Sequence, residues 1–169
     1  MRWMHRPYVK KALSFLKKAN LTISGTWVDC GCGSGNYAHA LVHLGADPVI
    51  ALDINISNLY RIPFPIMVVA GDCGHLPVKD GSGSGVLYVN VLHYYKQPHF
   101  LIQEAYNVLK RNGYILVIEY SQSFSTAWDP YPLTAAEMEA LLKDFHFGVV
   151  KSTLLDVQYR PKYLIVGKK

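Results

Sequence analysis

The chain has 169 residues, of which 50% are hydrophobic and 17% are charged. This composition excludes intrinsic disorder and favours a well-buried sheet over a helical bundle with a charged shell. A chain of this length can bury one sufficient core without disulfides or metal ions. We therefore expect a single domain over residues 1–169, with an N-terminal helix within 1–20 and a core over 26–169.

The formal net charge of +5 leaves RNA binding open, but the cations are spread over helix faces and a C-terminal tail, as on solvated surfaces. No apolar run reaches the roughly 20 residues that span a bilayer, and the N-terminus lacks the apolar segment of a secretory signal. We expect a cytoplasmic protein without membrane contact. Cys30, Cys32 and Cys73 are too few for a disulfide framework, and their spacing matches no usual zinc pattern, so no metal site is expected.

In chain order, a helix is predicted over 7–20 and a short buried strand over 26–29. The strand runs into Val28–Asn36, where glycines occupy alternate positions: Gly31, Gly33 and Gly35. Glycine tolerates positive φ and lets a ligand approach bare backbone, and the helix expected to follow presents unpaired N–H groups. These features favour a nucleotide-like ligand. The G-x-G-x-x-G fingerprint of NAD enzymes is not met, because its sixth position is Asn36.

The next helix ends at Gly45, and a strand over 48–53 again closes an apolar run with an acid, Asp53. Asp53 follows Gly31 by 22 positions, close to the separation at which Rossmann-like folds place an acid on ribose hydroxyls. A short connection over 55–65 precedes a strand over 66–70. The sequence thus predicts a βαβ unit whose strand ends face one ligand site.

The segment 80–85, Asp-Gly-Ser-Gly-Ser-Gly, is predicted to be a flexible loop before a strand over 86–90. A helix opened by Pro98 is expected to end at Gly113, with Lys110 and Arg111 near its C-terminus. A strand over 114–119 follows.

The Ser- and aromatic-rich segment 120–133 is either a substrate lid or an ordered connection. Thr134 and Glu137 form a capping box for the next helix. Strands over 147–156 and 159–167, joined at 157–158, predict an antiparallel hairpin.

An acid followed by G-x-G-x-G at Asp29–Gly35, together with Gly71–Pro77 after the third strand, resembles the first and third motifs of the class I S-adenosylmethionine-dependent methyltransferases. The resemblance implies an α/β fold: a three-layer Rossmann-like sandwich with a seven-stranded, mostly parallel sheet of order 3-2-1-4-5-7-6. It also implies S-adenosylmethionine as cofactor.

The resemblance places Asp29 near the methionine ammonium, directly or through water, and Asp53 on the ribose. Asp72 would accept from the adenine amino group while the Cys73 N–H meets a ring nitrogen. The full set of expected cofactor-binding residues is Asp29, Gly31, Gly33, Gly35, Asp53, Ile54, Asp72, Cys73 and Asn90.

After the fourth strand, His93 is the first candidate for proton transfer, because an imidazole titrates near neutral pH. Tyr94 or Tyr95 could orient the acceptor, and the alternative is that His93 merely packs beside the cofactor. A small-molecule acceptor is favoured, because the chain most resembles family members that act on small molecules. The motifs for adenine, glutamine, cytosine and catechol methylation are absent, so the sequence does not name the acceptor. An RNA (tRNA) or protein methyltransferase and a non-catalytic cofactor-binding partner subunit remain alternatives, whereas an NAD oxidoreductase is disfavoured.

Overall fold

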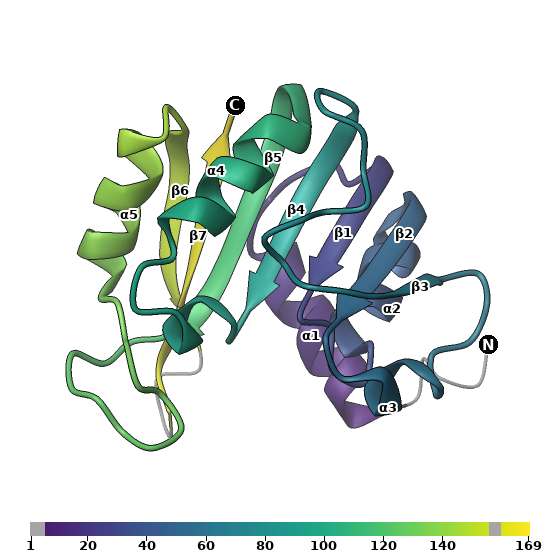
Figure 1. Cartoon of the computed structure of the whole chain (residues 1–169), viewed down its shortest axis with the longest axis horizontal. Helices are drawn as coiled ribbons and strands as arrows, with labels where there is room; N and C mark the ends of the chain where they lie inside the picture. The colour runs from purple at the N-terminus through teal and green to yellow at the C-terminus, as the bar shows by residue number, and fades with distance from the viewer. Residues whose placement is uncertain (1–5, 156–159) are drawn as a thin grey trace.

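The computed structural model describes residues 6–155 and 160–169, which form one seven-stranded sheet with helices on both faces (Figure 1). In chain order the elements are α1 (Pro7–Lys17), β1 (Gly25–Cys30), α2 (Asn36–Leu44), β2 (Ala46–Asp53), α3 (Ile56–Leu59), β3 (Met67–Ala70), β4 (Gly83–Val89), the 3₁₀ helix η2 (Leu92–Tyr94), α4 (His99–Val108), β5 (Leu109–Tyr120), α5 (Ala135–Asp144), β6 (Gly148–Leu155) and β7 (Lys162–Lys168). No helix in these described ranges is long and apolar enough to cross a membrane.

The strand order is β3-β2-β1-β4-β5-β7-β6, so the predicted order is confirmed. The first five strands pair in parallel, while β7 is antiparallel to both β5 and β6. The closing antiparallel pair is therefore confirmed, although its predicted connection at 157–158 lies outside the described residues. All parallel strands end at the same edge of the sheet, which is where the expected site residues come together.

Alternate residues of each strand supply the two halves of the core, because successive side chains of a strand point to opposite faces. Val28 and Tyr88 pack on the face covered by α4 and α5, and Trp27 and Leu87 pack on the face covered by α1 and α2 (Figure 1). The sheet is thus the middle of three layers, as predicted.

The structure corrects the predicted loop over 80–85, because β4 already begins at Gly83 and pairs with β5. A Cβ on Gly85 would lie 2.3 Å from the ring of Trp27 on the neighbouring strand. Gly85 is therefore a strand residue that makes room for the largest side chain of the core. The Gly- and Ser-rich composition of residues 80–85 suggested a flexible loop, whereas packing against the neighbouring strand fixes the conformation of Gly85.

The predicted end of the fourth helix at Gly113 is also wrong: α4 ends at Val108 and β5 begins at Leu109. Lys110 and Arg111 consequently lie in β5. The cation at the end of α4 is instead Lys169, whose Nζ donates to the carbonyl oxygens of Tyr106 at 2.5 Å and Leu109 at 2.7 Å. A residue about 60 positions away in sequence thus satisfies the helix terminus.

Candidate active site

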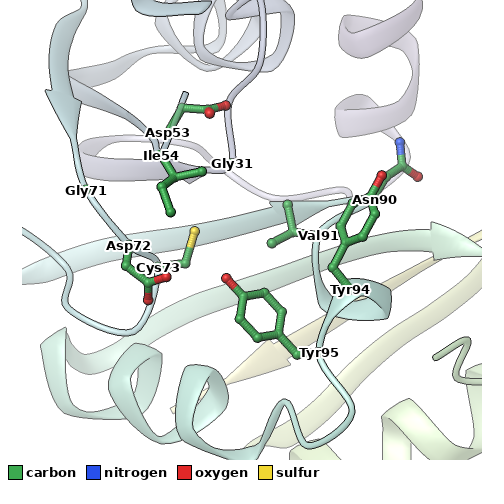
Figure 2. A pocket seen from close by; sticks show the side chains of 10 residues that line it. All are labelled: Gly31, Asp53, Ile54, Gly71, Asp72, Cys73, Asn90, Val91, Tyr94 and Tyr95. Atoms are coloured by element: carbon green, nitrogen blue, oxygen red, sulfur yellow. The ribbon is translucent and has the colours of Figure 1, made fainter. Parts of the chain in front are cut away.

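A pocket of about 290 Å³ opens at the carboxyl edge of the sheet, where the strand order reverses between β1 and β4 (Figure 2). It is lined by Gly31, Asp53, Ile54, Gly71, Asp72, Cys73, Asn90, Val91, Tyr94 and Tyr95. Eight of these are residues that the sequence analysis named for the site. The other predicted residues, Asp29, Gly33, Gly35 and His93, do not line this pocket.

The glycine turn between β1 and α2 has the expected backbone conformation, with φ of +64° at Gly31, +51° at Gly33 and +74° at Gly35. Gly31 is the one that reaches the pocket, and a Cβ there would lie 2.5 Å from a methyl carbon of Val91. Gly33 instead donates its N–H to Asp53 Oδ2 at 2.8 Å, and Gly35 precedes α2. The three glycines therefore shape one turn, of which the first borders the ligand space.

Asp29 closes β1 as a buried carboxylate, with 1% of the residue exposed. Its Oδ2 has no hydrogen-bond partner within the part of the chain that the structure describes. Burial, chiefly, raises the pKa of Asp29 to about 7; the Ala38 N–H opposes this rise and the charge of Asp53 adds to it. A buried carboxylate with an unsatisfied oxygen is stabilised by a nearby cation, so a cationic ligand would supply the missing partner.

Asp53 lines the pocket at the end of β2 and holds the glycine turn against it. Its Oδ1 accepts from the Asn55 N–H at 2.8 Å, and its Oδ2 accepts from Gly33 and, at 3.3 Å, from Asn58 Nδ2. A carboxylate offers about four lone-pair positions. One position therefore remains for a ligand hydroxyl, so Asp53 can both build the turn and meet a ribose.

Asp72, Cys73 and Tyr95 line another side of the pocket. Asp72 is exposed and accepts from the Gly74 N–H at 2.7 Å through Oδ1. Tyr95 extends its ring into the middle of the lining residues, between Cys73 and Val91 (Figure 2). Burial, followed by the charge of Asp72, raises the pKa of Tyr95 to about 12, which keeps its phenol protonated. Tyr95 was expected to orient the acceptor and not to bind the cofactor.

On the opposite side, Asn90 closes β4 with a left-handed backbone, φ +53°. Its Oδ1 accepts from Lys162 Nζ at 2.8 Å, and this ammonium lies 4.3 Å from the ring centroid of Tyr120. Lys162 begins β7, which is far from Asn90 in sequence. The contact connects the pocket with the β5–β7 end of the sheet.

A buried acid that the sequence analysis left without a role holds the loop after β4. Glu119 Oε1 accepts from the N–H groups of Val91 at 2.7 Å and Leu92 at 2.8 Å, and Oε2 lies 2.7 Å from His93 Nδ1. Its signal was present, since Glu119 ends an apolar strand just as Asp29 and Asp53 do. Glu119 thus orients η2, whose residue Tyr94 lines the pocket.

His93 is 4% exposed and lies behind Tyr94, with 4.2 Å between the two ring centroids. Its Nε2 has no hydrogen-bond partner in the described ranges. Asp129, also buried, lies 4.0 Å from His93 Nδ1, and burial is the main cause of the raised pKa of Asp129. The Tyr131 N–H donates to the His93 carbonyl oxygen at 2.9 Å. The segment 120–133 is therefore anchored on η2, and its movement as a lid stays a prediction.

No group of three or more His, Cys, Asp or Glu side chains in the described part of the chain is placed to hold a metal ion. The chemistry of the pocket is that of its carboxylates, amides and phenols. The fold and this lining together define an α/β protein that binds a nucleoside-like cofactor at a switch point in the strand order.

A family model described as "Methyltransferase domain" matches residues 28–117, which is more than half of the chain. The chain belongs to this family, the class I S-adenosylmethionine-dependent methyltransferases, whose cofactor is S-adenosylmethionine. The matched range begins just before the glycine turn and includes every residue that lines the pocket.

Known proteins similar to the chain include an uncharacterised protein of Methanocaldococcus jannaschii, 34% identical over 92 residues. That match covers 54% of this chain and 39% of the relative, so the chain matches less than half of the relative's length.

The solved structures that share the fold include the following two. A 1,6-didemethyltoxoflavin-N1-methyltransferase of Burkholderia thailandensis, with bound 1,6-didemethyltoxoflavin and S-adenosylhomocysteine, has a TM-score of 0.78 at 18% identity, covering 99% of this chain and 80% of its own. A methyltransferase in complex with the Trm112 methyltransferase activator of Haloferax volcanii has a TM-score of 0.79 at 20% identity, covering 99% and 90%.

Proposed function

We propose that the chain transfers a methyl group from S-adenosylmethionine to a small-molecule acceptor. The observation that carries this proposal is Asp29, a buried carboxylate with an unpartnered oxygen at the base of the glycine turn. Family membership supports the cofactor, and the residues present fit it: one acid for its ammonium, a second for its ribose and a third for its adenine amino group.

Each of three acids would meet a different part of the cofactor. Asp29, which does not itself line the pocket, would attract the ammonium directly or through water, Asp53 would accept from a ribose hydroxyl, and Asp72 would accept from the adenine amino group. The Cys73 N–H would donate to a ring nitrogen of the adenine. Gly31, which has no side chain, would let the ligand lie against the backbone. When bound, S-adenosylmethionine supplies an electrophilic methyl group on a sulfonium.

On the acceptor side, Tyr94 is the exposed phenol of the pocket lining and is suited to position the acceptor. His93 is the group that could take a proton, with Nδ1 fixed by Glu119 and Nε2 open. Because His93 is buried, its alternative role is to hold Tyr94 in place. A His93→Ala variant with unchanged S-adenosylhomocysteine affinity and an altered pH profile of turnover would favour proton transfer, whereas a uniform loss at every pH would favour positioning.

Calorimetric titration of the full chain tests the proposal. S-adenosylhomocysteine should bind and NAD should not, because the turn lacks the dinucleotide spacing. A labelled-methyl screen against metabolite, tRNA and protein pools then identifies the acceptor class. Binding of NAD without S-adenosylhomocysteine would contradict the assignment, and labelling of tRNA alone would replace the small-molecule acceptor with RNA.

We also propose, as a second function, that the chain works with a partner protein that docks on the β3 edge of the sheet. β3 is a terminal strand, and Met67 and Val68 on it are 53% and 45% exposed. Phe64 and Tyr60, which precede β3, are 93% and 84% exposed. An unpaired edge with large apolar neighbours is suited to accept a β-strand from another protein. The Haloferax neighbour, which is bound to an activator, is consistent with such an arrangement.

Co-expression with a library of small activator proteins, followed by size-exclusion chromatography, tests this partner. A Phe64→Ser, Met67→Lys double variant should lose a co-eluting partner that the wild type retains. Val150→Lys is the matched control, because Val150 is 55% exposed on β6, the opposite edge of the sheet. Equal loss with the control, or full retention by the double variant, would place the partner elsewhere.

A further inference from the structure

A buried acid of the segment 120–133 lies beside His93 and has no hydrogen-bond partner. Asp129 is 1% exposed, and both of its carboxylate oxygens lack a partner within the described residues. Its Oδ1 lies 4.0 Å from His93 Nδ1, which is too far for a hydrogen bond. Buried carboxylates are normally hydrogen-bonded or paired, so an acid in this state points to a partner that the chain itself does not supply.

Other polar atoms next to Asp129 also lack a donor. His93 Nδ1 lies 2.7 Å from Glu119 Oε2, and an ionised carboxylate only accepts, so we assign the proton of the neutral His93 ring to Nδ1. Nε2 is then an acceptor, and it is buried without a partner in the part of the chain that the structure describes. Thr126 pairs with Asp129 through the backbone, and its Oγ1 is likewise buried without a described partner. A ligand that donates several hydrogen bonds would satisfy these atoms.

The charges around Asp129 favour a cation as that ligand. Glu119 and Asp129 are two buried acids beside one imidazole. Burial is the main cause of the raised pKa of Asp129; the charge of Glu119 adds to the rise, whereas His93 and Arg160 oppose it. Arg160 is exposed, rests on the Tyr120 ring and makes no ion pair with Asp129 among the described residues. A ligand cation would therefore meet an acid that the chain leaves unpaired.

The segment that carries Asp129 has few main-chain bonds to the rest of the protein. Its N–H groups donate to other elements at Ser121 and at Tyr131. Between these two positions the backbone hydrogen bonds that the structure describes join Thr126 and Asp129 to each other. Residues 122–130 can therefore move away from η2 at the cost of few contacts, which would open a path to the buried atoms.

We propose that Asp129 is a specificity-determining residue of the acceptor subsite and that the acceptor carries a protonated amine. The inference rests on the proposed methyl transfer and names a substrate class for it. An ammonium group has both N–H donors and a positive charge, which together supply what Asp129 lacks. The rings of His93 and Tyr94, with centroids 4.2 Å apart, connect this acid with the pocket that Tyr94 lines. The ammonium would lie at Asp129, and the rest of the acceptor would extend past Tyr94 toward the cofactor.

The test uses the full chain saturated with S-adenosylhomocysteine and two probes of matched shape, tyramine and its neutral alcohol counterpart 4-(2-hydroxyethyl)phenol. Titration followed by saturation-transfer NMR measures both affinities. Asp129→Asn keeps the size of the side chain and removes its charge, so it should weaken tyramine binding about tenfold and leave the alcohol within about twofold. Asp144→Asn is the matched control, since Asp144 is an exposed acid at the end of α5.

A stability measurement separates recognition from a structural role of Asp129. The charge of a buried acid without hydrogen-bond partners does not stabilise the fold, so the thermal unfolding midpoint of Asp129→Asn should equal or exceed that of the wild type. A fall of more than about 4 °C would assign Asp129 to holding the segment 120–133 in place and would overturn the proposal.

The binding measurements can also overturn it. Equal affinity of the two probes for the wild type, equal weakening of both by Asp129→Asn, or an equal effect of Asp144→Asn would remove the recognition of an amine by Asp129. Normal S-adenosylhomocysteine binding without detectable binding of either probe would refute the amine acceptor and leave the proposed methyl transfer standing. Failure of S-adenosylhomocysteine to bind would refute the proposed function itself.

Discussion

The two halves of the carboxyl edge use buried acids in opposite ways. On the β1–β2 side Asp29 is 1% exposed and keeps one oxygen without a partner in the described structure. On the β4–β5 side Glu119 is 3% exposed, and its two oxygens take two backbone N–H groups and the His93 ring. Both acids end an apolar strand, so the sequence pattern is the same. Asp29, with an unsatisfied oxygen, is the acid for which we propose a ligand, whereas the hydrogen bonds of Glu119 are used to hold the loop after β4.

The largest effect is expected from the pH dependence that Asp29 imposes on the ligand-free protein. Its pKa rises from the model-peptide value of 3.8 to about 7 on folding, so the folded state binds this proton more tightly. The free energy of unfolding should therefore fall as pH increases from about 4 to 7, by about 4 kcal/mol from this group. Asp29→Asn should lose that slope, which urea unfolding between pH 4.5 and 8 measures.

The same residue links protonation to binding. A cationic ligand beside Asp29 favours the carboxylate, so S-adenosylhomocysteine should release about one proton when it binds near pH 6. Calorimetry in two buffers of different ionisation enthalpy measures the release. Wild-type protein that releases no proton, or an Asn variant that releases as much as wild type, would separate Asp29 from the ammonium.

Glu119→Ala should produce the next largest change, on stability. The substitution leaves the N–H groups of Val91 and Leu92 buried without an acceptor and removes the partner of His93. We expect a loss of about 3 kcal/mol in the free energy of unfolding, because each buried orphan costs about 1–3 kcal/mol. Glu119→Gln keeps one acceptor oxygen and should lose less. Glu139→Ala on the surface of α5 is the control, and a similar midpoint shift for Glu139→Ala and Glu119→Ala would contradict this account.

Two alanine substitutions in the glycine turn, at Gly31 and at Gly33, should give intermediate losses of stability that can be compared directly. Gly31 and Gly33 both have positive φ, so alanine at either position carries about 1–2 kcal/mol of backbone strain. A Cβ at Gly31 also collides with Val91, whereas nothing lies within 4 Å of a Cβ at Gly33. Gly31→Ala should therefore destabilise the protein by about 1 kcal/mol more than Gly33→Ala. Equal unfolding midpoints would show that Val91 moves aside freely.

Sequence reasoning reached the features of this protein that depend on local pattern. Acids at the ends of apolar strands, the glycine spacing and the capping box of Thr134 and Glu137 were all readable, and the structure has the box with both reciprocal bonds. The features that sequence reasoning missed depend on contacts between residues far apart in the sequence. Gly85 is fixed in β4 by the Trp27 ring, and the last carbonyls of α4 are satisfied by Lys169. No local window contains both members of either pair.

The same limit applies to the site. Asp53 lines the pocket as expected, but its hydrogen bonds to the glycine turn and to Asn55 and Asn58 were not foreseen. The role of Glu119 could have been suspected, since its position repeats the pattern of Asp29. Lys162 could not have been placed, because only the pairing of β7 with β5 brings it to Asn90.

The smallest predicted effect concerns Asp72, the exposed acid that follows β3. Its Oδ1 accepts from the Gly74 N–H, and a carboxylate with further lone pairs can also accept from the adenine amino group. Because water competes at this exposed position, Asp72→Asn should weaken S-adenosylhomocysteine binding about fivefold, or about 1 kcal/mol, with stability unchanged within about 0.5 kcal/mol. The inosine analogue of the ligand, which has an acceptor in place of the amino group, should lose less affinity, since the Asn amide can donate to it. Equal losses for both ligands would mean that Asp72 acts by holding the Gly74 turn and not by contacting the adenine. Asp72 would then be a structural acid, as Glu119 is for the loop after β4, and exposure would not distinguish the acids that bind the cofactor from those that hold loops.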